Sequence, residues 1–225
     1  MKKLFKMSAV ILFVLIVFSA CGRNESVSRK ITSFPPYGER VVTAIGDSIA
    51  AGYGLDSQED NYLTLFSDNI GAVLNNDAVS GYDSGEVLKS LSDEKTAADI
   101  KNADAIVVSV GGNDFFHRKD IMIDALKNAL LHGEGFFPEE VTNIYDEYEK
   151  NLSRIIDEIK NMNPDAYIIV QTVYNPFLKQ TLNFSYINVG KTANRYVTRL
   201  NDSIKNVCKT KNRVFVFDVA PEMNE

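Results

Sequence analysis

Short apolar runs, rich in β-branched residues, recur along the chain and are each stopped by glycine or polar residues. Uninterrupted runs of this kind are typical of strands buried on both faces of a parallel sheet. The four clearest runs occupy residues 41–45, 105–110, 167–173 and 214–218. A weaker strand is expected at 72–74, or just after it at 78–79.

Between these runs, two long stretches show apolar residues at helical spacing. The spacing predicts a helix over 142–162, which Asn163-Pro164 would end, and another over 187–207. Strands that alternate with helices form βαβ units around a parallel sheet. We therefore predict an α/β fold with three layers, α/β/α, in which helices cover both faces of a doubly wound, flavodoxin-like parallel sheet of about five strands.

The first 20 residues follow another pattern. Three lysines precede an uncharged apolar run from Met7 to Phe18, which is shorter than the roughly 20 residues of a membrane-spanning helix and fits a secretory signal. The run ends in Ser19-Ala20-Cys21, which resembles the lipobox of bacterial lipoproteins and implies that Cys21 is lipidated. Plain secretion and an uncleaved anchor are the alternatives, and Phe18 argues against plain secretion.

These features divide the chain into three parts. Residues 1–20 are expected to be a signal peptide, 21–38 a flexible polar tether, and 39–225 one folded domain. We expect the domain to lie outside the cytoplasm, held at the membrane through the lipid on Cys21. Loss of the signal lysines would take the net charge from −6 to −9.

Composition narrows the classes of partner. A chain this acidic is a poor nucleic-acid binder, because phosphate contacts require clustered lysine and arginine. No His, Cys and Asp cluster has the spacing of metal ligands, so no metal is expected. The first turn, at residues 46–50, is neither G-x-G-x-x-G nor a P-loop. Although the sheet is expected to be flavodoxin-like, this turn therefore opposes the function of a flavodoxin-like or receiver-like module. We expect no cofactor. Oligomeric state is left open.

Small and polar residues stand at the carboxyl ends of three predicted strands. These ends meet at one edge of a parallel sheet, where ligands of α/β proteins bind. The three blocks are Gly46-Asp47-Ser48, Ser80-Gly81 and Gly111-Gly112-Asn113-Asp114. Taken singly, Ser48 could be a helix N-cap and the third block a plain turn.

In this order and spacing the three blocks resemble the SGNH (GDSL-type) hydrolases, and the resemblance extends over about residues 40–220. It implies a serine ester hydrolase with Ser48 as nucleophile. The backbone N–H groups of Ser48 and Gly81 and the side-chain amide of Asn113 would form the oxyanion hole. Supporting roles would fall to Gly46, Asp47 and Gly112.

A serine nucleophile requires a base. In the family this base is a histidine in a D-x-x-H block after the last strand, and neither His117 nor His132 stands in such a block. Two explanations are open: a hydrolase domain incomplete at its C-terminal end, or a degenerate member that binds lipids or esters without turnover. Either way, little turnover is expected from this chain.

The substrate is the least determined property. The resemblance allows lysophospholipids, acyl thioesters, simple esters and acetylated sugars. The loop from Asn175 to Asn188 could line an acyl site or pack on the core. Its apolar residues are Phe177, Leu178, Leu182, Phe184 and Tyr186.

Overall fold

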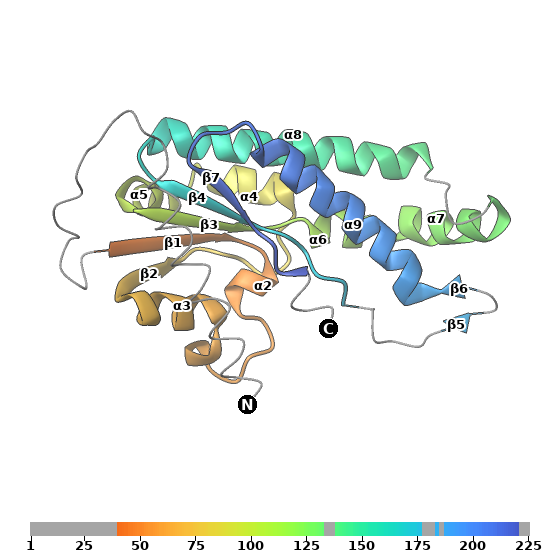
Figure 1. Ribbon diagram of the computed structural model, residues 1–225, viewed down its shortest axis with the longest axis horizontal. Helices are drawn as coiled ribbons and strands as arrows, with labels where there is room; N and C mark the ends of the chain where they lie inside the picture. The colour runs from red at the N-terminus through yellow and green to blue at the C-terminus, as the bar shows by residue number, and fades with distance from the viewer. Residues whose placement is uncertain (1–39, 133–137, 177–182, 185–186, 221–225) are drawn as a thin grey trace, which may run out of the picture.

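A five-stranded parallel sheet forms the centre of the molecule, with strand order β2-β1-β3-β4-β7 (Figure 1). The computed structural model describes residues 40–132, 138–176, 183–184 and 187–220. The strands are β1 Arg40–Gly46, β2 Ala72–Asn76, β3 Ala105–Ser109, β4 Tyr167–Gln171 and β7 Val214–Phe217. The predicted parallel α/β sheet is therefore confirmed, and of the two positions for the weak strand the first is correct.

Helices connect the strands as the alternating pattern predicts. They are α2 Ser48–Ala51, α3 Tyr62–Ile70, α4 Ser84–Ser90, α5 Glu94–Asn102, α6 Gly112–Phe116, α7 Lys119–His132, α8 Glu139–Met162 and α9 Val189–Cys208. A 3-10 turn, η1, spans Gln58–Asp60, and the short strands β5 Asn183–Phe184 and β6 Ile187–Asn188 pair antiparallel. The two long predicted helices are α8 and α9. Within the described part of the chain, no helix combines the length and apolarity needed to cross a membrane.

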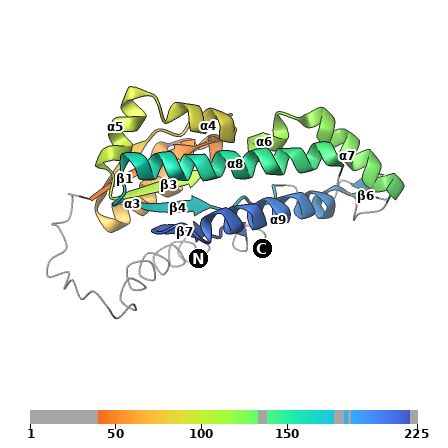
Figure 2. The ribbon, with the colours of Figure 1, turned by 90° about the horizontal axis from the view of Figure 1, so that it is seen from above.

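The two faces of the sheet are covered by different helices, as Figures 1 and 2 show. Side chains alternate between the faces along each strand. Ile45, Ile106 and Ile168 belong to the larger core under α4, α5, α8 and α9. Val42, Ala44 and Val107 point the other way, toward α2 and α3. The result is the predicted arrangement of three layers.

Helix α8 anchors the larger core. Its buried residues recur at helical spacing, so one stripe faces the sheet and α9 while the opposite face is charged. The fully buried Tyr148 donates a hydrogen bond from its hydroxyl to the Val110 carbonyl, at 3.1 Å. This bond fixes the chain just after β3, where the third block begins.

Three earlier predictions fall outside the described residues. These are the signal peptide at 1–20, the tether at 21–38 and most of the apolar side chains expected between Asn175 and Asn188.

Candidate functional site

Ser48 is the first residue of α2, directly after β1. The preceding residue, Asp47, caps this short helix: its Oδ1 accepts a hydrogen bond from the Ile49 N–H at 3.0 Å. The Asp47 N–H donates to the Ser109 carbonyl at 2.9 Å, which ties the turn to the end of β3. Ser48 thus sits half-buried on a turn whose direction is set by its neighbours.

Gly46 is required by this turn for a steric reason. Its φ is +148°, and a Cβ placed there would overlap the Ser109 carbonyl oxygen. The two residues lie side by side in the parallel register of β1 and β3. A glycine therefore allows the first and third blocks to meet.

Two side-chain amides, of which only that of Asn61 is buried, hold the end of α2, and the sequence pattern did not indicate them. Asn61 and Asn76 both donate from Nδ2 to the Ala50 carbonyl, at 3.0 and 2.8 Å. Asn61 is fully buried and also caps α3, accepting from the Leu63 N–H. Its place before a helix was the available signal, since asparagine is a favoured N-cap.

The loop after β2 carries Gly81 to the same edge of the sheet. The Val79 N–H donates to the Gly46 carbonyl at 3.0 Å, so the loop runs beside the end of β1. Gly81 is exposed and has a φ of +94°, with no atom within 4 Å of the position of a Cβ. The glycine is needed here for its backbone conformation, on an exposed part of the loop.

Asn113 lies in the first turn of α6 and joins the third block to the second. Its Nδ2 donates to the carbonyl of Tyr82, the residue after Gly81, at 2.9 Å. The preceding Gly111 has a φ of +138°, and a Cβ there would come within 3.1 Å of the Tyr148 ring. The turns that carry Ser48, Gly81 and Asn113 therefore converge at the carboxyl ends of β1, β2 and β3.

A buried polar network holds α6 against α4. Ser84 donates to Asp114 from both its hydroxyl and its N–H, and Asn151 on α8 donates to the Ser84 hydroxyl at 3.0 Å. Burial raises the pKa of Asp114 to about 6, and burial also raises the pKa of Asp47 to about 6. The bond from Ser84 to Asp114 joins residues 30 positions apart, and the bond from Asn151 to Ser84 joins residues 67 positions apart. No local sequence motif could therefore predict the network.

His117 lies beside the second block, paired with a carboxylate. Its Nδ1 is 3.3 Å from Asp83 Oδ2, and its side chain is 45% exposed. Asp83 and Glu86 form the capping box of α4. With His117 they place three possible ligand atoms within 4.8 Å of one another, a proximity that sequence spacing did not indicate. Both carboxylates already have a structural role, because they cap the N-terminus of α4. His132 ends α7, outside the residues whose side chains are described.

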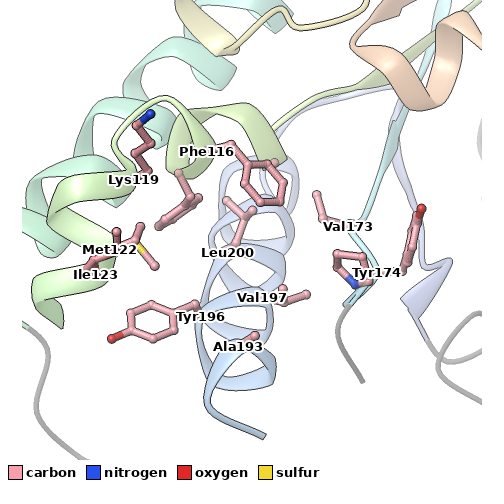
Figure 3. A pocket seen from close by; sticks show the side chains of 13 residues that line it. Phe116, Lys119, Met122, Ile123, Val173, Tyr174, Ala193, Tyr196, Val197 and Leu200 are labelled. Atoms are coloured by element: carbon pink, nitrogen blue, oxygen red, sulfur yellow. The ribbon is translucent and has the colours of Figure 1, made fainter. Parts of the chain in front are cut away.

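A cavity of about 270 Å³ opens next to the start of α6 (Figure 3). Its walls come from α6 and α7 on one side, from α9 on another, and from the segment just after β4. The lining residues are Gly112, Phe115, Phe116, Lys119, Met122, Ile123, Val173, Tyr174, Pro176, Ala193, Tyr196, Val197 and Leu200. The sequence left open whether the loop from Asn175 to Asn188 lines an acyl site or packs on the core. Of that loop, only Pro176 lines the cavity among the described residues.

Known proteins share this architecture. Over 193 residues the chain is 27% identical to YpmR, an uncharacterized protein of Bacillus subtilis, covering 83% of this chain and 70% of that protein. Over 142 residues it is 28% identical to the spore germination lipase LipC of Bacillus licheniformis, covering 60% of this chain but only 64% of LipC, less than two thirds of its length. The crystal structure of the lipase Lip_vut3 from a goat rumen metagenome superposes with a TM-score of 0.62 at 19% identity, covering 81% of each chain.

A sequence model of one family extends over all three blocks and beyond them. The model of the GDSL-like lipase/acylhydrolase family matches residues 44–225, which include every turn and the cavity described above. The chain therefore belongs to the GDSL-like lipase/acylhydrolase family.

Proposed function

We propose that this protein is a serine ester hydrolase in which Ser48 is the nucleophile. The observation that carries the proposal is the convergence of three turns on one sheet edge, two of which offer backbone N–H groups there. Among the described residues, no hydrogen bond involves the Ser48 hydroxyl or the N–H groups of Ser48 and Gly81. These donors are available to a substrate oxygen.

In the proposed reaction the Ser48 Oγ attacks the ester carbonyl carbon and passes its proton to a base, a histidine or a water molecule, which later returns it to the leaving alcohol. The carbonyl π electrons move to the oxygen, and this oxyanion accepts hydrogen bonds from the N–H groups of Ser48 and Gly81 and from the Asn113 amide. Collapse of the intermediate breaks the bond to the alcohol, which leaves with a proton. Water then hydrolyses the acyl-serine. Asp47 and Gly46 hold the turn and take no part in bond making.

The proton acceptor determines how fast this reaction runs. The family base is a D-x-x-H histidine, and neither histidine of this chain stands in that pattern. A chain without such a histidine would turn over slowly. The residual rate would come from the oxyanion hole and substrate binding, which supply about 10³–10⁴-fold in serine proteases that lack a triad member.

An alkyl fluorophosphonate tests the nucleophile directly, because it forms a stable bond to an activated serine. We expect the folded full chain to be labelled at Ser48, slowly where no histidine base is present but faster than the urea-unfolded chain because the oxyanion donors also bind the phosphonyl oxygen. Peptide mass spectrometry locates the label, and Ser48→Ala should remain unlabelled. Equal labelling of folded and urea-unfolded protein would overturn the proposal. Asn113→Ala should slow the labelling by about 10²–10³-fold, the typical loss of one oxyanion donor.

A second function is favoured by the histidine pattern: a lipoprotein on the same fold that binds lipids or esters without hydrolysing them. It predicts an unlabelled Ser48 in a protein that still binds alkyl ligands. The fluorophosphonate experiment therefore separates the two functions.

We also propose that Cys21 carries the lipid and that residues 21–38 tether the domain outside the membrane. Support comes from the N-terminal lysines, the short apolar run and the small residues before Cys21. Growth with an alkyne-tagged fatty acid should label the wild-type protein in the membrane fraction. Cys21→Ser should abolish the label, whereas Cys208→Ser should keep it.

A further inference from the structure

We infer that the cavity between α6–α7 and α9 receives the acyl chain of the ester that Ser48 attacks, so that the protein selects lipid acyl esters over acetyl esters and acetylated sugars. This inference rests on the proposed function, because it assigns the substrate class of the same site. Its evidence is the position of the cavity and the chemistry of its walls.

The cavity begins where the oxyanion hole ends. Gly112 lines it, and the next residue is Asn113, whose amide bonds to the second block. Across from Gly112, Val173 and Tyr174 follow β4, the neighbour of β3 in the sheet. The cavity therefore lies at the carboxyl edge that carries Ser48, and a chain attached to a carbonyl held there can enter it.

The walls suit hydrocarbon. Figure 3 shows Met122 and Ile123 on the side of the α9 residues Tyr196 and Leu200, whereas Val197 points toward Val173 and Tyr174. Leu200 and Tyr196 are buried, at 2% and 7% exposed, so the floor is fixed by core packing. A sugar placed here would lose its hydrogen bonds to water without replacement, which is costly. Each buried methylene, by contrast, should raise affinity about fourfold.

Lys119 is the one charged residue among the lining residues. Lysine commonly packs its aliphatic stem along apolar surface while its ammonium group stays in water. Lys119 is exposed, so it fits the rim of a cavity whose interior is apolar. It does not alter the preference for an uncharged chain.

The test compares the rates at which decyl and ethyl fluorophosphonate label Ser48 in the full chain. Ala193→Phe fills the cavity from α9, and Ile123→Trp fills it from α7, so that one variant serves if the other does not fold. We expect the decyl-to-ethyl rate ratio to fall at least tenfold in each. Thr198→Phe introduces the same ring on the exposed side of α9 and should leave the ratio unchanged. An unchanged ratio in both cavity variants would overturn the inference.

A photoreactive decyl alcohol, which needs no serine chemistry, separates this inference from the proposed function. In the Ser48→Ala chain it should cross-link to the peptides that contain Met122 or Val197, and Ala193→Phe should reduce that yield at least fivefold. Cross-linking elsewhere would overturn the inference. If cross-linking persists while no fluorophosphonate labels wild-type Ser48, the hydrolase function fails and the cavity stands as a lipid-binding site.

Discussion

At position 46 the chain passes so close to the Ser109 carbonyl oxygen that only a hydrogen atom fits on the α-carbon. Gly46→Ala adds a methyl group at that point and also strains a positive φ. We expect it to lower the free energy of unfolding by at least about 3 kcal/mol, as measured by urea denaturation.

Gly54→Ala is the matched control. Gly54 also has a positive φ, +82°, but nothing lies within 4 Å of a Cβ there. This variant isolates backbone strain and should cost about 1 kcal/mol. Equal losses in the two variants would mean that the contact with Ser109 does not constrain the turn.

At the scale of elements, α2 is too short to hold its own position. It has four residues, and the amides of Asn61 and Asn76 fix its Ala50 carbonyl. Asn61→Ala removes one of these bonds together with the cap of α3. We expect a loss of about 2 kcal/mol in the free energy of unfolding and slower labelling of Ser48, because the turn that carries Ser48 is held less firmly.

Asn102→Ala provides the comparison for that variant. The Asn102 amide is exposed, and within the described part of the chain it bonds only to the Ala98 carbonyl of its own helix. Its loss should change the free energy of unfolding by less than about 0.5 kcal/mol. A similar loss at both positions would contradict the supporting role of Asn61.

The elements themselves could be predicted from the sequence, and the contacts that position the site could not. The strand runs and the stripe of α8 are local patterns, since each is set by a repeat of two or 3.6 residues. The three blocks follow strand ends, so their convergence followed from the parallel sheet. The bonds from Asn61 to Ala50 and from Ser84 to Asp114 join residues that only the finished fold brings together. No periodicity encodes them.

For the whole molecule, two buried carboxyl groups make stability depend on pH. Burial raises the pKa values of Asp47 and Asp114 from 3.8 to about 6. Between these limits the folded state binds more protons than the unfolded state, so the free energy of unfolding falls as pH rises from about 4 to 6. Asp47→Asn keeps a side-chain acceptor for the cap and should flatten this fall, as measured by urea denaturation across the window. If the free energy of unfolding of this variant fell with pH as steeply as that of the wild type, a raised pKa of Asp47 would be contradicted.

The thiol of Cys208 reports on opening of the domain as a whole. It is 3% exposed at the end of α9, and burial raises its pKa to about 11 from 9.0. At neutral pH this leaves about 100-fold less thiolate than in an exposed cysteine. In the Cys21→Ser chain, iodoacetamide should therefore modify the folded protein at least about 100-fold more slowly than the urea-unfolded protein. Fast modification of the folded chain would show that α9 detaches readily.

The proposed catalytic groups and the proposed acyl cavity come from different stretches of the chain. The turns of β2, β1 and β3 all belong to residues before 115, whereas the cavity is built chiefly by residues 115–200. Two residues of the later stretch also support the early turns, because Tyr148 donates to the Val110 carbonyl and Asn151 to the Ser84 hydroxyl. Under the two proposals, recombination that replaces the later stretch while keeping these two contacts would change the substrate. Chimeras joined shortly after Asp114, within α6, and retaining Tyr148 and Asn151 would keep the turns of Ser48, Gly81 and Asn113 while exchanging the proposed acyl preference.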